Sequence, residues 1–220
     1  MMVSIRRIID LSVSIRTYMP VWPTNPLPDV KPIGILPRDG YNVESIQMVT
    51  HTGTHVDAPY HMLESPITVD QLDLNRLIGY GYVVRPKFNG VEITKDDLNR
   101  VWRPEYDGNI VLIETGWWKK RAFTKEFLYD FPGLSIDAAK FLLDHNVKAV
   151  GIDTLGIEPY NHKDFEVHKL LLSRDVYIVE DLTNLSELEN GKRYFVVILP
   201  IKFQGASGSM ARVVAIDFGE

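Results

Sequence analysis

The chain has 220 residues, of which 45% are hydrophobic, and a formal net charge of −5 at pH 7. This length suits one domain with a substantial core, and the composition excludes a disordered chain. The negative charge argues against a nucleic-acid surface, and no apolar run approaches the roughly 20 residues that span a bilayer.

In chain order, the N-terminus has arginines and then Ile8-Ile9-Asp10 in place of a signal-peptide apolar core, so we expect a cytoplasmic protein. Strands are expected at residues 8–11 and 43–50. The intervening residues 18–37 are rich in proline, which predicts a long ordered N-terminal arm and not a Gly/Ser linker. Another strand is expected at 80–88.

In the rest of the chain, segments expected to be helices alternate with segments expected to be strands, which predicts an α/β fold. Thr94 starts a capping-box-like sequence for a helix to about residue 101, and Ser135 is the expected N-cap of a helix to about residue 146. A third helix is expected at 166–173. Strands are expected at 109–114, 147–152, 176–180, 194–199 and 211–216. No linker or repeat is visible, so one domain is expected over 1–220.

The segment His51-Thr-Gly-Thr-His55-Val-Asp57-Ala-Pro-Tyr-His61 holds half of the six histidines. Gly53 and the threonines are poor helix formers, so we interpret the segment as extended, with a bend at Gly53 that brings His51 and His55 together. Imidazole with carboxylate suits zinc, manganese or iron. Without cysteine, such a site is typical of catalysis, although a surface histidine cluster that binds metal by accident is the alternative.

A second group of polar side chains lies far along the chain. Asp153 and Glu180 each end an expected strand, where α/β sheets place chemistry, and His168 lies in an expected helix. Spacing alone does not show whether these residues meet the histidine segment; a solvated helix face and an exposed strand end are the alternatives.

The histidine segment matches the H-x-G-T-H-x-D-x-P-x-H signature of the metal-dependent cyclase family, which includes bacterial kynurenine formamidase and isatin hydrolase. Further stretches along most of the chain also resemble the family: Met19-Pro-Val-Trp22-Pro, Glu114-Thr-Gly-Trp117, Gly151-Ile-Asp153-Thr-Leu, the run from His168 to Leu182, and Leu199-Pro-Ile-Lys-Phe-Gln-Gly205. At Trp22-Pro23-Thr24 and Ala206-Ser-Gly-Ser209 the chain departs from the formamidase branch, which leaves the substrate open.

The resemblance implies a role for each matching residue. His51, His55 and Asp57 match one set of metal ligands. Asp57 as a bridge, with His168 and Glu180, matches a second set. One or two Zn²⁺ or Mn²⁺ ions per chain are therefore expected, and His61 matches the general acid/base.

The resemblance also implies a single compact α/β domain with a central mixed, barrel-like β-sheet flanked by helices, of the swivelling β/β/α type. It implies a homodimer or higher homo-oligomer and a small-molecule substrate, with no nucleic-acid or membrane partner.

Residue chemistry adds a mechanism. A metal lowers the pKa of water to about 7, and His61 can move a proton to a leaving nitrogen. His61 could instead be a ligand or support one. Trp22, on the stiff arm, is the best candidate for a substrate wall. We expect hydrolysis of an amide-type C–N bond of a small aromatic or cyclic substrate, with arylformamidase activity first. A cyclic amide or lactone hydrolase or a cyclase, and a metal-binding protein without turnover, are the alternatives.

Overall fold

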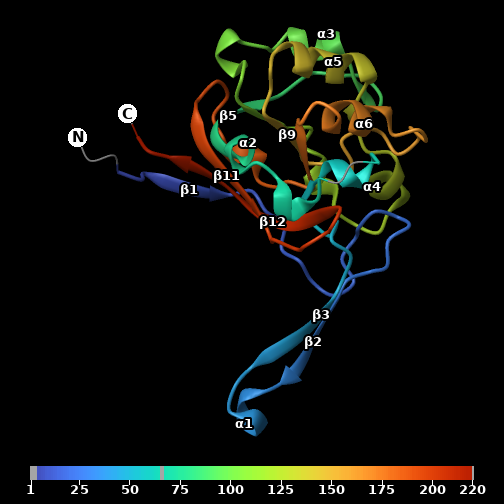
Figure 1. The fold of residues 1–220 in the computed structure, drawn as a ribbon, viewed down its shortest axis with the longest axis vertical. Coiled ribbons are helices and arrows are strands. Elements are labelled where there is room, and N and C mark those ends of the chain that lie inside the picture. The colour runs from blue at the N-terminus through green and yellow to red at the C-terminus, as the bar shows by residue number, and fades with distance from the viewer. Residues whose placement is uncertain (1–3, 65–66, 220) are drawn as a thin grey trace.

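The computed structural model describes residues 4–64 and 67–219. Within them, seven strands of a mixed sheet form a closed ring, in the order β12, β11, β5, β7, β9, β10, β4 and back to β12 (Figure 1). An eighth strand, β1 (Arg7–Asp10), pairs antiparallel with β12. The ring consists of β4 (His55–Asp57), β5 (Ile78–Val84), β7 (Ile110–Ile113), β9 (Ala149–Ile152), β10 (Tyr177–Glu180), β11 (Tyr194–Pro200) and β12 (Gly208–Asp217). The expected α/β fold with a barrel-like mixed sheet is confirmed.

Strands β5, β7, β9 and β10 run parallel. Three helices pack against one face of these strands: α3 (Lys95–Asn99), α5 (Ile136–Asp144) and α6 (Glu166–Leu172). Both faces of β7 are buried, because Ile110 and Leu112 join one hydrophobic cluster while Val111 and Ile113 join the cluster that includes the helices. Continuous apolar runs such as this one are typical of parallel strands covered on both faces.

The expected helix starts are confirmed. The Thr94 side chain accepts a hydrogen bond from the Asp97 backbone N–H in a capping box, and the Ser135 side chain accepts one from the Ala138 N–H. Each cap satisfies a donor that the first helical turn leaves unpaired. These two helix starts could be predicted from the sequence because each cap joins residues only three positions apart.

A hairpin projects from the body of the molecule (Figure 1). It consists of β2 (Asp29–Gly34), α1 (Leu36–Asp39) at its tip and β3 (Val43–Gln47). The second half of the proline-rich region, expected to be a long ordered arm or loop, contains the strand β2. The strand expected at 43–50 ends at Gln47, because the chain turns before it enters the histidine segment.

Several short elements were not expected. They are β6 (Glu92–Ile93), β8 (Gly133–Leu134), α2 (Leu74–Leu77), α4 (Lys125–Tyr129), and the 3₁₀ turns η1 (Pro59–His61), η2 (Val69–Gln71), η3 (Pro104–Tyr106), η4 (Trp117–Lys120) and η5 (Leu185–Glu187). Elements of two to five residues contain too little of a hydrophobic period to be recognised. No helix in residues 4–64 and 67–219 has the length and apolar character needed to cross a membrane.

Candidate metal centre

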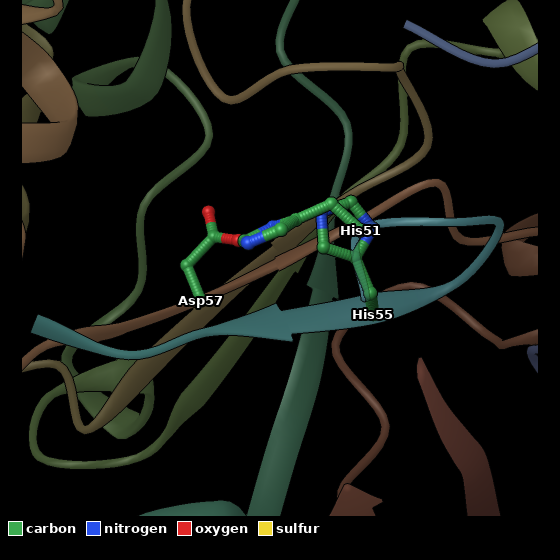
Figure 2. Close-up of side chains that lie close together, drawn as sticks. All are labelled: His51, His55 and Asp57. Atoms are coloured by element: carbon green, nitrogen blue, oxygen red, sulfur yellow. The ribbon is translucent and has the colours of Figure 1, made fainter. Parts of the chain in front are cut away.

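Three side chains of the histidine segment converge on one point, which Figure 2 shows. Nδ1 of His51 lies 2.8 Å from Oδ1 of Asp57, and Nε2 of His55 lies 3.4 Å from the same oxygen. We call His51, His55 and Asp57 the local cluster. Gly53 supplies the expected bend with a φ of +65°, a conformation that residues with a Cβ rarely adopt.

A second group shares Asp57. Nε2 of His168, in α6, lies 3.9 Å from Oδ2 of Asp57 and 3.1 Å from Oε1 of Glu180. Glu180 ends β10, and the antiparallel register of β10 and β4 places it opposite His55. We call Asp57, His168 and Glu180 the assembled cluster. The structure thus brings together all five residues that the resemblance assigned to metal binding.

The donor atoms of each cluster lie within 4.8 Å of one another, which is compatible with a shared ion. Asp57 supports this interpretation most directly. Its side chain is fully buried, and although imidazole nitrogens lie close to both carboxylate oxygens, no contact from the described residues has hydrogen-bond geometry. A buried carboxylate without such bonds is costly unless a cation compensates its charge. Nitrogen donors with carboxylate oxygens fit zinc or manganese.

The clustered imidazoles change the charge state of the site. Burial alone would raise the pKa of Asp57, but His61, His51 and His55 hold it well below the ordinary value. Burial also opposes a charge on His168, but hydrogen bonds to Glu158 and Glu180 raise its pKa to about 10. Asp57 is therefore an anion at neutral pH, as a ligand must be, whereas Nε2 of His168 must release its proton when it binds a cation.

Each candidate ligand histidine is held through its other ring nitrogen. Nε2 of His51 is hydrogen-bonded to Oγ of Ser207 at 2.9 Å, and Nδ1 of His55 to the carbonyl oxygen of Gly53 at 2.8 Å. Nδ1 of His168 is hydrogen-bonded to Oε1 of Glu158 at 2.6 Å. Such outer partners fix the ring orientation of metal-binding histidines.

His61 is close to the clusters but differs from their histidines. It lies in the 3₁₀ turn η1, not in the extended segment that the strand-like spacing had suggested, because Pro59 starts a turn. Its ring stacks on that of His51, with 4.0 Å between the centroids. Burial lowers the pKa of His61 to about 4, with His51 and His168 acting in the same direction against Asp57. The imidazole is therefore neutral at pH 7 and can accept a proton.

A cavity of about 460 Å³ opens onto the clusters. His61 and Glu180 lie in its wall together with Trp22 from the proline-rich region. The Trp22 ring packs against Tyr160 and Phe131, with centroid distances of 5.1 and 5.9 Å. Trp22 thus lies in the same cavity as the polar groups, together with Phe165.

Sequence reasoning misplaced one residue and missed two. Asp153, grouped with Glu180 as a strand-end carboxylate, lies outside both clusters and accepts hydrogen bonds from the backbone N–H groups of Thr115 and Gly116. Glu158 and Ser207, which hold His168 and His51, were not identified. Their roles depend on contacts across the fold, and Ser207 lies 156 residues from His51.

The chain resembles known proteins in sequence and in fold. The family described as "Putative cyclase" matches residues 9–159. The chain is 32% identical to a kynurenine formamidase of Geobacillus thermodenitrificans (strain NG80-2), over 96% of this chain and 98% of the relative. A solved structure described as a potential metal-dependent hydrolase with cyclase activity has a TM-score of 0.80 and 34% identity, covering 96% of this chain and 98% of that one. Isatin hydrolase A from Labrenzia aggregata, at 23% identity, has a TM-score of 0.85 over 97% and 94% of the two chains and shows the shared fold.

Proposed function

This chain belongs to the cyclase family, and from that premise we propose that it is a metal-dependent hydrolase that cleaves an amide-type C–N bond of a small aromatic substrate. The observation that carries the proposal is Asp57. Its two buried oxygens lack hydrogen bonds from the described residues and face imidazoles on either side, and these imidazoles line a cavity.

We assign the local cluster to one divalent cation and the assembled cluster to a second, with Asp57 as the shared ligand. Zn²⁺ and Mn²⁺ both suit these donors, and cellular availability decides between them. A bound cation supplies Lewis acidity, which polarises a carbonyl group and lowers the pKa of water toward 7.

His61 is the residue assigned to proton transfer. Its neutral imidazole takes a proton from the attacking water and returns it to the nitrogen that leaves when the C–N bond breaks. The His61 ring stacks on that of His51 and lies in the wall of the cavity, where it can meet water and substrate. His51, His55 and His168 are each held by an outer partner, which suits ligands and not a mobile proton carrier.

The leading substrate class is the N-formyl arylamines. Trp22 offers a flat apolar surface in the same cavity as the polar groups, against which an aromatic ring can pack. The relative from Geobacillus that matches 96% of this chain is named kynurenine formamidase, which supports the same class.

The test is a substrate screen on metal-depleted protein reloaded with Zn²⁺ or Mn²⁺, using N-formyl anilines, cyclic imides and lactones. We expect hydrolysis of the N-formyl anilines, lost on chelation and restored by the ion. Preferential opening of cyclic imides or lactones would replace this substrate class with the cyclic one. Absence of metal-dependent turnover on every substrate would contradict the proposal.

We also propose that the chain forms a homodimer through its projecting hairpin. Ile33, Leu36, Tyr41 and Ile46 expose 59–63% of their surface there. Ion pairs within the hairpin join Lys31 to Asp29 and Arg38 to Asp39, which leaves an apolar surface to be covered. A two-stranded hairpin is at best marginally stable alone in water.

A second copy is the proposed occupant because the body of the chain carries its own exposed apolar side chains, Leu199, Ile201 and Phe203, that one symmetric contact can cover together with the hairpin. Light scattering after gel filtration should give twice the chain mass, and Ile46→Glu should give the monomer mass. A wild-type monomer at micromolar concentration would refute this assembly.

A further inference from the structure

Glu158 is a buried carboxylate to which the proposed mechanism gives no role. It lies between β9 and α6, and only 1% of its surface is exposed. Its Oε1 is 2.6 Å from Nδ1 of His168 and accepts the backbone N–H of the same residue at 3.1 Å. Oε2 accepts the backbone N–H of Val167 at 3.4 Å. Glu158 therefore contacts both the ring and the backbone of His168.

The backbone around Glu158 is tightly packed. A Cβ built on Gly133 in β8 would come within 2.5 Å of the Cα of Glu158. The segment that carries Glu158 is thus packed closely against a strand, and three hydrogen bonds restrain its carboxylate. An ionised carboxylate in this position forms a short, charge-assisted bond to the His168 ring.

The partner of His168 differs in charge from those of the other candidate ligand histidines. His51 is held by a hydroxyl group and His55 by a backbone carbonyl, both neutral. His168 is held by a carboxylate. A carboxylate behind an imidazole fixes the ring orientation and increases the basicity of the ligand nitrogen.

We infer that Glu158 is a positioning residue that holds Nε2 of His168 toward Asp57 and Glu180 and thereby sets the affinity of the assembled cluster for its cation. The inference rests on the proposed metal chemistry. The local cluster, whose histidines depend on Ser207 and Gly53, should not sense Glu158.

A matched control is available among the side chains that contact one another from Glu92 through His162 to Glu158. His162 follows Glu158, with Nδ1 3.5 Å from Oε2 of Glu158, and Nε2 of His162 is hydrogen-bonded to Oε1 of Glu92 at 2.8 Å. Glu92→Gln makes the same chemical change as Glu158→Gln at the outer end of this series of contacts, without a direct contact to His168.

The experiment titrates metal-free wild type, Glu158→Gln and Glu92→Gln with Zn²⁺ in competition with a chelator of known affinity, and repeats the titration with Co²⁺ to follow its absorption bands. Loss of an outer partner typically weakens metal binding by about 10–100-fold. We expect that loss for one of two ions in Glu158→Gln, with altered Co²⁺ bands for that ion only. Glu92→Gln should match wild type.

Three results would overturn the inference: wild-type affinities for both ions in Glu158→Gln, an equal loss for both ions together with a lower melting temperature, or a wild-type protein that binds no ion at the assembled cluster. If Glu158→Gln does not fold, Glu158→Asp replaces it, because it keeps the charge that caps α6 but withdraws the carboxylate by one methylene. A selective loss for one ion is again expected, and equal affinities would refute the role.

The titration separates this inference from the proposed function. Selective loss of one ion without hydrolysis of any N-formyl arylamine would sustain the role of Glu158 and contradict the substrate. Metal-dependent hydrolysis of N-formyl arylamines with unchanged metal affinities in the Glu158 variants would support the proposed function and contradict the role of Glu158.

Discussion

The two clusters share Asp57 but are constructed differently. The local cluster takes its three side chains from seven consecutive residues, 51–57, and needs only a bend at Gly53 to bring them together. The assembled cluster joins β4 to the start of α6 and the end of β10, more than 100 residues along the chain. The first depends on local spacing and the second on the topology of the barrel. Variants of the two clusters should therefore differ in how much metal they lose.

His55→Ala should have the largest effect, because His55 lies at the junction of the clusters. Its Nε2 is 3.4 Å from Oδ1 of Asp57 and 3.4 Å from Oε2 of Glu180. We expect metal content near zero by elemental analysis and turnover at the uncatalysed background. His145→Ala, at the end of α5, is the control and should keep its metal. Wild-type metal content in His55→Ala would show that neither cluster depends on this residue.

Glu180→Gln should remove only the ion of the assembled cluster. The amide retains an oxygen that can accept the hydrogen bond from the Ile157 backbone N–H, so the fold should remain intact. Metal content should fall from about two ions per chain to about one, with a loss of turnover exceeding the 10–100-fold typical of an outer partner. Unchanged metal content and activity would mean that Glu180 is structural.

Gly208→Ala should weaken the local cluster indirectly. An added Cβ would meet Cε1 of His51 at 2.5 Å and the backbone oxygen of Val56 at 2.7 Å, so the His51 ring must move. We expect about tenfold weaker binding of one ion, and a destabilisation of about 1–3 kcal/mol in thermal unfolding from overpacking. Gly79→Ala is the control, since its Cβ meets only the end of Lys148 at 4.0 Å. Equal metal affinities in the two variants would contradict the contact with His51.

His61→Ala should leave bound metal unchanged, because His61 is assigned to neither cluster. Turnover should nevertheless fall by about 10²–10⁴-fold, the usual contribution of a proton-transfer group. Parallel metal analysis and steady-state kinetics give both values. Metal loss as complete as in His55→Ala would make His61 a ligand, and full turnover would exclude it from the proton transfer.

Sequence reasoning reached the local cluster because its donors and its bend lie within one short segment. It also predicted the helix starts at Thr94 and Ser135, whose caps form within three residues. His168 and Glu180 could be linked to Asp57 only through a family resemblance, since no periodicity links positions 57, 168 and 180.

The supporting residues could not be predicted at all. Nothing near Glu158 or Ser207 in the sequence indicates which histidine each will contact, because strand order and helix docking decide that. The same limit explains Asp153. A carboxylate at a strand end can point into a site, as Glu180 does, or bind the backbone of the neighbouring connection, as Asp153 does at Thr115 and Gly116.

Strand β4 links these ligands to the folding of the whole barrel. Only three residues long, it pairs with β10 on one side and β12 on the other, and two of its residues are His55 and Asp57. When β4 separates from β10 and β12, the ring of strands is open and neither metal cluster is intact. An ion that binds only the closed state stabilises it by mass action, by about 2.7 kcal/mol when its free concentration is 100 times its dissociation constant. Amide hydrogen exchange in β4 should therefore slow as metal is added, so local unfolding of one short strand reports the occupancy of the site.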